Sequence, residues 1–501
     1  MAQLTRRSFL QKSALITAGA AFSARSWSQV SGANGDIRLA IAGLNGRGKE
    51  LARDFRTIPG VRIVALCDVD TAVLDRELAT ARAAGTSPDT VVDFRELLAR
   101  RDIDAIAIAT PNHLHALQSI WAMEAGKDVL HEKPVSHNIW EGAQILAAQK
   151  KYRRIVQVNT QSRSSVAIAE ALAWTRAGNI GKVTAVRGLV YKRRLSIGKT
   201  TGPVPVPVTV NYDLFQGPAP LVPLRRVNFH YDWHWQWATG NGDMVAQGNH
   251  QLDIGRRFLG DPGHPAGVFT IGGRFGYDDD GETPNTFIIH YDYPTPYFFE
   301  VRGLPVKPDE LSAAGAIGGG LGTAEKLAAS MDQYRGLTVG NVVHCEGGYV
   351  TIPSRDYSLA QAFDHQGKLL QEFKGAGYHH ANFLDAVRSR RESDLHGPLS
   401  QGHLSCTLVH LANISYRTGR HLKPEEIRDQ INGSNQLAEP FGRFREHLAR
   451  NSVDLEKTPA QFGAPLKFNA TTERFTGENS EAANKLLSRD YRAPFVVPQL
   501  A

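Results

Sequence analysis

The chain has 501 residues, of which 42% are apolar and 21% are charged. This is the composition of a soluble globular protein with room for two or three domains. The formal net charge of +7 falls to +3 without the four basic residues of an N-terminal stretch that carries no acid, Arg6, Arg7, Lys12 and Arg25. So small an excess gives no case for binding nucleic acid or an anionic membrane.

The N-terminus resembles a bacterial twin-arginine (Tat) export signal. Arg6 and Arg7 precede a Phe-Leu pair, a further basic residue and a weakly apolar run over residues 13–22. The run is too short to span a membrane, and the alternative is a basic amphipathic start of a cytosolic protein. We expect residues 1–32 to be a signal peptide, the Tat machinery to be a partner and the mature protein to be periplasmic. Because this route carries folded proteins, a cofactor can be loaded first and would have to stay bound.

From Ile37 onward the chain alternates short apolar runs with helical patterns, which is typical of parallel βαβ units. The predicted strands cover residues 37–42, 61–66, 90–92, 105–109, 127–130 and 155–158. The predicted helices begin after the first glycine-rich turn and then cover residues 71–84, 94–100, 115–125 and 140–152. We therefore assign residues 36–160 to a doubly wound domain of the Rossmann type.

A glycine-rich turn follows the first predicted strand. Gly43, Gly46 and Gly48 allow a tight turn and a close backbone approach. Asn45 takes the second glycine position of G-x-G-x-x-G, a mild departure because asparagine tolerates left-handed backbone. The free N–H groups of the following helix, which starts near Arg47, suit a pyrophosphate. A glycine-rich turn alone is more often just a turn, but its place between strand and helix favours a dinucleotide site.

An acid ends the second predicted strand. Asp68 lies at about the spacing expected for a carboxylate that binds the adenosine ribose. It would repel a 2′-phosphate, and no arginine follows it closely. The sequence therefore predicts NAD as the cofactor, in preference to NADP.

The second half of the chain has a different pattern. A helix over 166–177 is followed by alternating runs over 183–191, 267–274, 286–291, 297–301 and 348–352. These predict an α+β domain with a large, mostly antiparallel open sheet that carries helices on one face. Helices are also predicted over 379–390 and 402–417, and residues 303–341 are expected to form an insertion. We assign residues 161–450 to a substrate and oligomerisation domain and 451–501 to a surface tail.

Four motifs occur in order at predicted strand ends: AIAGLNGRG, ALCDVD, ATPNHLH and HEKPVSHN. They resemble those of the Gfo/Idh/MocA oxidoreductases, a family named for glucose–fructose oxidoreductase and inositol dehydrogenase. The resemblance continues in VNTQSR, NYDLFQGPAP, GNGDMVAQGNHQLDIGRRFLG and FGYDDDGETPNT, and covers nearly all of the mature chain. It implies an NAD(P)-dependent enzyme acting on carbohydrates. Sheets of the family often associate through their open faces, which implies a homo-oligomer.

The resemblance assigns cofactor contacts to the motif ATPNHLH, which ends the predicted strand over residues 105–109. Ligands of doubly wound sheets bind beyond the carboxyl ends of the strands, and Thr110, Asn112 and His113 match positions that touch the dinucleotide. His115 is also assigned to the cofactor, although a proline-stopped strand end with a capping asparagine is an alternative. His113 and His115 have no third ligand at useful spacing, so we predict no metal. Cysteines are few and far apart and show no metal or disulfide pattern: Cys67, Cys345 and Cys406.

The resemblance also names two catalytic residues. It implies that Lys133 points at the substrate hydroxyl beside the nicotinamide, where an ammonium stabilises alkoxide charge and a lowered pKa allows proton relay. The alternative is a solvated surface lysine. Glu132 is expected to orient Lys133 or to bind the nicotinamide ribose. His250 matches a general acid/base, but relatives often carry Asp four residues earlier, where this chain has Ala246.

Other residues are assigned to the site on weaker grounds. Asp253 is expected either to orient His250 or to cap a helix, and Gln161 to reach the cofactor. Substrate contacts are expected from Arg163, Tyr191, Asn249 and Trp233. The aromatic run over 230–237 suits sugar rings, and a core or dimer-face cluster is equally compatible with it. Tyr191 has even odds of being a surface residue.

Three functions are compatible with these motifs. The first is an oxidoreductase that transfers hydride from a sugar, sugar derivative or polyol to tightly bound nicotinamide. The second is a redox-neutral glycoside hydrolase or epimerase that oxidises a ring hydroxyl transiently and then returns the hydride. The third is a carbohydrate-binding protein on an inactive scaffold, which the presence of Lys133 and His250 disfavours.

Overall fold

The computed structural model describes residues 35–305, 330–354, 357–432 and 435–501. The expected signal peptide lies outside these ranges. So does most of the segment predicted to be an insertion, including its run of glycines.

The first domain is built on a six-stranded parallel sheet with the order β3-β2-β1-β4-β5-β6. The chain order reverses on the two sides of β1, which opens a crevice at the carboxyl ends of β1 and β4. Every residue of β4 and β5 is buried, because helices cover both faces of the sheet. The predicted doubly wound domain is confirmed. Its strands are β1 (Ile37–Ala42), β2 (Val61–Cys67), β3 (Asp89–Val91), β4 (Ala105–Ile108), β5 (Asp128–His131) and β6 (Val156–Val158).

The helices of this domain follow its strands in turn. They are α3 (Arg47–Phe55), α4 (Thr71–Ala83), α5 (Phe94–Leu98), α6 (His115–Glu124) and α7 (Ile139–Tyr152). One further helix comes from much later in the chain. In α12 (His379–Ser389), Phe383 and Leu384 pack in one core cluster with Leu39 of β1 and Phe55 of α3. The helical cover of the first domain therefore includes α12, which lies outside the predicted range of residues 36–160.

The second sheet has twelve strands, and most neighbouring pairs are antiparallel. This confirms the predicted second domain; β10 and β7 pair in parallel. The path runs β14-β13-β12-β11-β7-β10-β9-β8-β16-β15, with β17 also paired to β8. The strands up to β14 are β7 (Val183–Tyr191), β8 (Gly267–Gly273), β9 (Thr286–Tyr291), β10 (Tyr297–Arg302), β11 (Val339–Cys345), β12 (Gly348–Pro353), β13 (Leu359–Phe363) and β14 (Leu369–Lys374).

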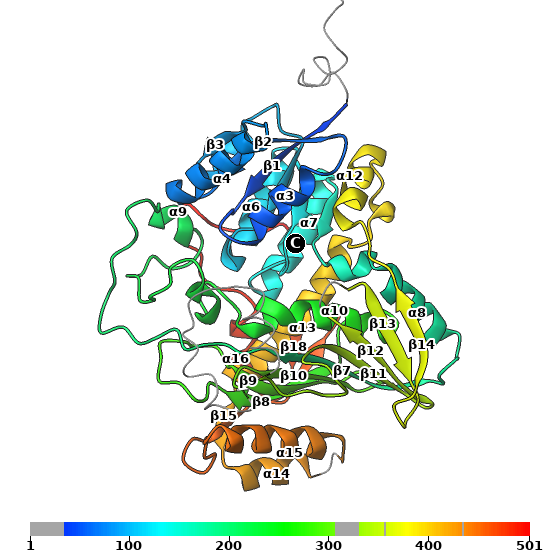
Figure 1. The fold of residues 1–501 in the computed structure, drawn as a ribbon. Coiled ribbons are helices and arrows are strands. Elements are labelled where there is room, and N and C mark those ends of the chain that lie inside the picture. The colour runs from blue at the N-terminus through cyan, green and yellow to red at the C-terminus, as the bar shows by residue number, and fades with distance from the viewer. Residues whose placement is uncertain (1–34, 306–329, 355–356, 433–434) are drawn as a thin grey trace, which may run out of the picture.

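Helices cover both faces of this sheet, so the prediction of helices on one face is wrong. On the face toward the first domain lie α8 (Val166–Arg176), α10 (Asn249–Phe258) and α13 (Leu399–Arg417). On the other face lie α14 (Pro424–Ile431) and α15 (Asn435–Arg450) (Figure 1). Two successive residues of β10 point to opposite faces of the sheet. Phe299 packs with α10 and α13, and Phe298 packs with α14 and α15.

Two other expectations about the second half need correction. The last three residues of the predicted insertion, 339–341, belong to β11 (Val339–Cys345), which pairs with β7 in the middle of the sheet. The segment after residue 451 is not only a surface tail, because it adds short strands to the sheet edge and a helix. These elements are β16 (Ala460–Phe462), β17 (Leu466–Asn469), β18 (Arg474–Thr476) and α16 (Ser480–Lys485), and β15 (Arg420–Leu422) pairs with β16.

The last residues of the chain return to the first domain, where Figure 1 places the C-terminus beside α7. Arg489 donates hydrogen bonds to the carbonyl oxygens of Ala238 (2.8 Å) and His113 (3.2 Å). The Tyr491 hydroxyl donates to Glu141 of α7 at 3.1 Å. Phe495 is 4% exposed and packs with the ring of Trp121 on α6. This C-terminal strap, residues 489–501, fixes the chain end to the cofactor domain.

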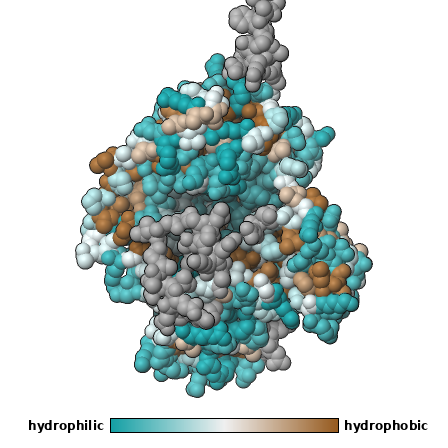
Figure 2. Space-filling model, in the orientation of Figure 1, coloured by the Kyte–Doolittle hydropathy of each residue, from teal (hydrophilic) through white to brown (hydrophobic). Residues whose placement is uncertain are grey.

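Apolar side chains gather at the left edge of the face shown in Figure 2, over the long segment that contains α9 (Tyr212–Gln216). Exposed members of that segment are Val208, Leu221, Val222 and Val227. Over the described ranges, no helix is both long enough and apolar enough to cross a membrane. All three cysteines are buried and free, as expected.

Candidate active site

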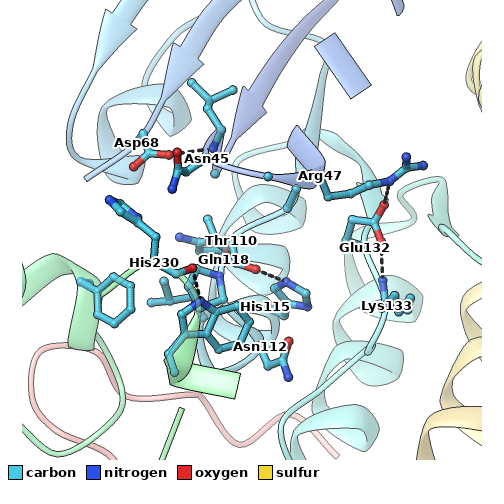
Figure 3. A pocket seen from close by; sticks show the side chains of 18 of the residues that line it. Asn45, Arg47, Asp68, Thr110, Asn112, His115, Gln118, Glu132, Lys133 and His230 are labelled. Carbon is cyan, nitrogen blue, oxygen red and sulfur yellow. Dashed lines mark hydrogen bonds and ion pairs between the residues drawn. The ribbon is translucent and has the colours of Figure 1, made fainter. Parts of the chain in front are cut away.

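A cavity of about 560 Å³ opens at the carboxyl ends of β1, β2, β4 and β5. The turns that follow these strands form one wall. Segments of the second half form the other wall, including residues 245–247, His250 and Tyr357. Figure 3 shows Asp68 and His230 at one end of the cavity and Glu132 with Lys133 at the other. The cavity therefore joins the predicted ribose site to the predicted catalytic lysine.

The glycine turn packs too closely to admit side chains at two positions. Gly43 has φ +82°, and a Cβ there would lie 2.6 Å from the backbone of Ala109. A Cβ on Gly48 would lie 1.8 Å from the carbonyl oxygen of Gly43. Asn45, Gly46 and Arg47 line the cavity between them, at the N-terminus of α3. The turn thus brings backbone N–H groups to the cavity, as a pyrophosphate requires.

The Asp68 carboxylate is held at the cavity by the turn itself. Its oxygens accept hydrogen bonds from the N–H of Leu44 (2.7 Å) and of Asp70 (3.1 Å), and burial raises its pKa. The side chain of Asp70 is paired with His230 at 2.8 Å. Of these two carboxylates, that of Asp68 lines the cavity, where it can accept hydrogen bonds from ribose hydroxyls.

Arg47 connects the glycine turn to the end of β5. Its guanidinium donates to Glu132 at 2.8 Å, and Asn159 donates to the same carboxylate. With its amide oxygen turned toward Arg47, Gln161 accepts from that guanidinium and donates to the Asn159 carbonyl at 3.0 Å. Burial opposes ionisation of Glu132, but Arg47 and Lys133 outweigh it and lower the pKa of this carboxyl. Glu132 is therefore an anion beside Lys133.

Lys133 reaches across the cavity to the second half of the chain. Its Nζ donates to the carbonyl oxygens of Val245 (3.1 Å) and Ala246 (2.9 Å). Both belong to a π-helical turn, η4 (Met244–Gly248). Burial lowers the pKa of Lys133 to about 8, although Glu132 acts in the opposite direction. Backbone carbonyls of η4 thus bind the ammonium, and Lys133 is not a solvated surface residue.

His250 lies in the first turn of α10 and also lines the cavity. Its ring centroid lies 5.7 Å from that of Tyr357. Its Nδ1 is buried and has no hydrogen-bond partner among the described residues. Burial and the nearby Lys133 charge lower the pKa of His250 to about 3. The imidazole is therefore neutral at physiological pH, with a ring nitrogen free for a ligand.

The residues after β4 divide into cavity contacts and internal supports. Thr110 and Asn112 line the cavity, and the Asn112 Nδ2 is buried and has no hydrogen-bond partner within the described part of the chain. This amide can donate to a cofactor amide or a sugar. The ring of His113 lies between the carbonyls of Thr239 (3.2 Å) and Phe215 (2.7 Å), and His113 does not line the cavity.

His115 lies at the edge of the cavity, but its ring nitrogens are also committed. They lie 2.7 Å from the Pro134 carbonyl and 2.6 Å from the Thr110 carbonyl. The ring therefore supports the turns after β4 and β5. With both nitrogens engaged in each ring, His113 and His115 offer no free nitrogen to a metal.

Besides His113 and Gly48, four more residues assigned to the site from the sequence do not line the cavity. Asp253 makes no hydrogen bond to His250; it is fully buried and pairs with Arg163 at 2.7 Å and with the hydroxyl of Ser405. The guanidinium of Arg163 forms ion pairs with Asp253 and Asp261. Both residues therefore support α10 from behind and do not touch the substrate side.

Tyr191 and Asn249 were predicted to contact the substrate, but neither lines the cavity. The Tyr191 hydroxyl donates to Glu300 at 2.6 Å and accepts from Arg443 of α15. It therefore belongs to the buried ionic network under α15, away from the cavity. Asn249 is 1% exposed and directs no atom to the cavity. The last six residues of β7 are all buried, so side chains on both faces of the strand are covered. The sequence therefore does not show to which face of the sheet Tyr191 points.

The aromatic run was predicted to form either a sugar-binding surface or a core cluster, and Trp233 belongs to both the cavity wall and a core cluster. It lines the cavity, stacks on His234 with ring centroids 3.7 Å apart, and belongs to a small core cluster with Phe215 and Phe229. Its indole N–H is already bonded to the His230 carbonyl at 3.0 Å. It is therefore an apolar wall of the site.

Sequence analysis missed several cavity residues, of which Tyr357 and Phe495 are two. Tyr357 has φ +57°, a backbone state that side chains rarely adopt and that is enriched at functional sites. Phe495 comes from the C-terminal strap. Neither lies near a recognisable motif, and no local pattern predicts that residue 495 reaches the cofactor domain.

Phe495→Ala is expected to speed release of bound cofactor at least tenfold. The ring closes one side of the cavity and packs against Trp121 and Arg95, and loss of a buried phenyl group costs about 1.5–3 kcal/mol of burial, which acts mainly on dissociation. The dissociation rate of prebound NADH, followed by its fluorescence, checks this. Leu500→Ala, in the same strap but away from the cavity, should leave the rate unchanged; equal rates in the two variants would contradict the prediction.

Comparisons with known proteins agree with this site. Residues 37–160 match the model described as oxidoreductase family, NAD-binding Rossmann fold. The first domain is therefore similar to the NAD-binding Rossmann domains of that family. This match agrees with the Gfo/Idh/MocA resemblance of the sequence motifs.

Curated relatives match part of the chain. A glycosyl hydrolase family 109 protein of Shewanella sp. (strain W3-18-1) is 32% identical over 123 residues, which are 24% of this chain and 27% of that protein. An uncharacterized oxidoreductase, ORF334 of Rhizobium meliloti, is 31% identical over 168 residues, 34% of this chain and 48% of that protein. The matches thus span between about a quarter and a half of these relatives.

Solved structures share the fold over most of the chain. The WlbA dehydrogenase of Chromobacterium violaceum, in complex with NADH and UDP-GlcNAcA, has a TM-score of 0.54 at 17% identity and covers 77% of this chain and 95% of that one. A levoglucosan dehydrogenase, in complex with NADH and levoglucosan, has a TM-score of 0.53 at 16% identity and covers 75% and 96%. At these identities the likeness concerns the fold alone.

Proposed function

We propose that this chain is an NAD-dependent oxidoreductase that oxidises a hydroxyl of a sugar, sugar derivative or polyol. The observation that carries the proposal is the meeting of Lys133 and His250 at one end of a cavity whose other end is built for a dinucleotide. The aromatic wall at Trp233 suits the apolar face of a sugar ring. The test is to identify the nucleotide that co-purifies with the folded protein, then to screen a carbohydrate panel for reduction of that nucleotide. Protein that neither carries nor binds NAD(H) would refute the proposal.

The pKa values of the two residues suggest how the proton is handled. A bound nicotinamide would supply the hydride acceptor. The proton of the substrate hydroxyl goes to the neutral amine of Lys133, because a pKa of about 8 is matched to neutral pH. His250 is neutral, with a pKa of about 3, and its ring N–H donates a hydrogen bond to the hydroxyl oxygen and orients it. This exchanges the roles implied by the family resemblance, in which the histidine takes the proton.

A redox-neutral reaction is the second candidate. It is favoured by the relatives named glycosyl hydrolase family 109 and by the enclosure of the cavity by the C-terminal strap, which suits a cofactor that is not exchanged. Transient oxidation of a ring hydroxyl would acidify the neighbouring C–H and allow elimination of the aglycone as an alcohol. Water would then add to the double bond, and return of the hydride would restore the hydroxyl. Product analysis separates the candidates: glycoside cleavage or epimerisation without net NADH supports this route, and accumulation of NADH with a keto product supports the dehydrogenase.

Cofactor choice rests on Asp68. Asp68→Asn is expected to weaken NAD binding about tenfold, since hydrogen bonds to a charged group contribute about 1.5–3 kcal/mol, and to narrow the preference for NAD over NADP. Titration of the apoprotein with NADH and NADPH measures both affinities. Asp75→Asn, an exposed aspartate on α4, is the control. An unchanged ratio of the two affinities in Asp68→Asn would remove the reason for preferring NAD.

Cellular location and assembly also remain proposals. The twin arginines support export through the Tat system to the periplasm, with cofactor loaded before transport. A homo-oligomer is expected from the family resemblance. However, α14 and α15 cover the outer face of the second sheet at β8–β10, so any association at that face would have to involve the helices.

A further inference from the structure

We propose that His264, His403 and Glu473 form a binding site for one divalent transition-metal ion, of which Zn²⁺ is the representative, and that this ion fastens the C-terminal strands to the body of the second domain. The ligand atoms of the three side chains lie within 4.8 Å of one another. The cluster is separate from the candidate active site, because none of the three residues lines that cavity.

The two imidazoles converge on one oxygen atom. The Nε2 atoms of His264 and His403 lie 2.8 Å and 2.7 Å from the same Oε1 of Glu473. Among the described residues, no lysine or arginine forms an ion pair with this carboxylate. A carboxylate that faces only two imidazoles leaves its negative charge without a fixed cation, and a bound dication would supply that charge.

The side chains of the two histidines are buried and held in place by their neighbours. The side chains of His264 and His403 are 4% and 3% exposed. The His264 ring packs edge-on against Phe468 at 5.4 Å. The His403 ring fills the space over Gly142 of α7, where a Cβ would lie 2.2 Å from its Nδ1. The pair is therefore a rigid, dry platform of the kind in which metal ligands are preorganised.

Glu473 completes the site from a turn. It lies between β17 and β18, has φ +49°, and its side chain is 23% exposed. The left-handed backbone turns the carboxylate inward, while the partial exposure leaves room for a solvent molecule as fourth ligand. Two imidazole nitrogens and one carboxylate oxygen are a donor set typical of Zn²⁺. Metal–ligand distances of about 2.0–2.2 Å place the donor atoms of a tetrahedral site about 3.3–3.6 Å apart. The present contacts of 2.8 Å and 2.7 Å would therefore open by about 0.5–0.9 Å when a metal binds.

The segments joined by the cluster define its role. His264 precedes β8, His403 lies on α13, and Glu473 lies in the β17–β18 turn. The contact pairs are separated by 209 and 70 residues, so an ion at this point closes long loops of the chain. Since the cluster lies apart from the cavity, we assign the ion a structural role.

The test uses full-length protein purified without a polyhistidine tag, stripped with EDTA and then given ZnCl₂. The wild type should retain about one zinc per chain after desalting, by elemental mass spectrometry, and its Tm should rise by about 3 °C or more. Glu473→Gln keeps an oxygen that accepts hydrogen bonds but removes the anionic ligand, and it should lose both the retained zinc and the Tm response. Glu478→Gln, the same change at a nearby exposed glutamate, should behave as the wild type.

Two results would overturn the proposal. One is a wild type that retains no zinc and shows no Tm change, which would make the cluster a hydrogen-bond network only. The other is equal zinc retention in wild type and Glu473→Gln, which would place the ion elsewhere. If Glu473→Gln does not fold, X-ray absorption of the zinc-loaded wild type decides, since the site requires scattering from two imidazoles, and its absence overturns the assignment.

Discussion

Lys133→Met is expected to lower kcat about 10³-fold while leaving NAD binding within a few-fold of the wild type. The side chain removed is the group with pKa about 8 that faces the reacting end of the cavity, and loss of a positioned acid–base group costs about 10²–10⁴-fold. The adenosine and pyrophosphate contacts at Asp68 and the glycine turn are untouched. Reduction of bound NAD⁺ by an accepted carbohydrate, followed by absorbance in a single turnover, measures the effect.

The pH dependence gives the sharper form of this prediction. Oxidation needs the neutral amine, so the wild-type rate should rise with pH and level off above an apparent pKa near 8. Lys133→Arg keeps the positive charge but does not deprotonate in this range, and its residual rate should show no such midpoint. A wild-type profile that is flat between pH 7 and 9 would exclude Lys133 as the proton acceptor. Full biological activity in Lys133→Met would favour the non-catalytic binding protein.

His250→Gln is expected to lower kcat about 10²-fold but to leave the apparent pKa near 8. The imidazole is neutral and its Nδ1 has no partner among the described residues, so its loss removes orientation of the substrate hydroxyl and not the titrating group. His421→Gln, an exposed histidine on β15, serves as the matched control for the same substitution.

The same variant separates the two assignments of the proton acceptor. If His250 takes the proton, His250→Gln should abolish the pH-dependent limb and Lys133→Arg should preserve it. If Lys133 takes the proton, the two profiles should be exchanged. The pH profiles of the two variants therefore show which residue accepts the proton, and this result does not depend on the absolute rates.

The sequence predicted the first domain well because its elements are marked locally. Strands buried on both faces appear as continuous apolar runs, and turns at their carboxyl ends carry the glycines, Asp68 and Lys133. The second half was predicted less fully, since β15 to β18 are three or four residues long and too short to show a period. Helices on the outer face could not be inferred from β10, whose six residues are all buried.

The site residues divide along the same line. Lys133 and His250 lie within recognisable motifs, and the structure brings them to one cavity. The pairing of Arg163 with Asp253 joins residues 90 positions apart, and no local pattern distinguishes such a partner from a substrate contact. The binding of Lys133 to the carbonyls of η4 depends on a π-helical turn, which the side-chain sequence does not report.

The C-terminal strap sets a time order for assembly of the site. Phe495 is among the last seven residues of the chain, and it forms part of the cavity wall together with turns that lie more than 350 residues earlier. Because the strap follows both domains in chain order, the first domain can fold during synthesis while the cavity is still open on that side. The wall closes only when the strap has docked. A variant that lacks residues 489–501 should therefore have a folded first domain and a cavity that is open on that side.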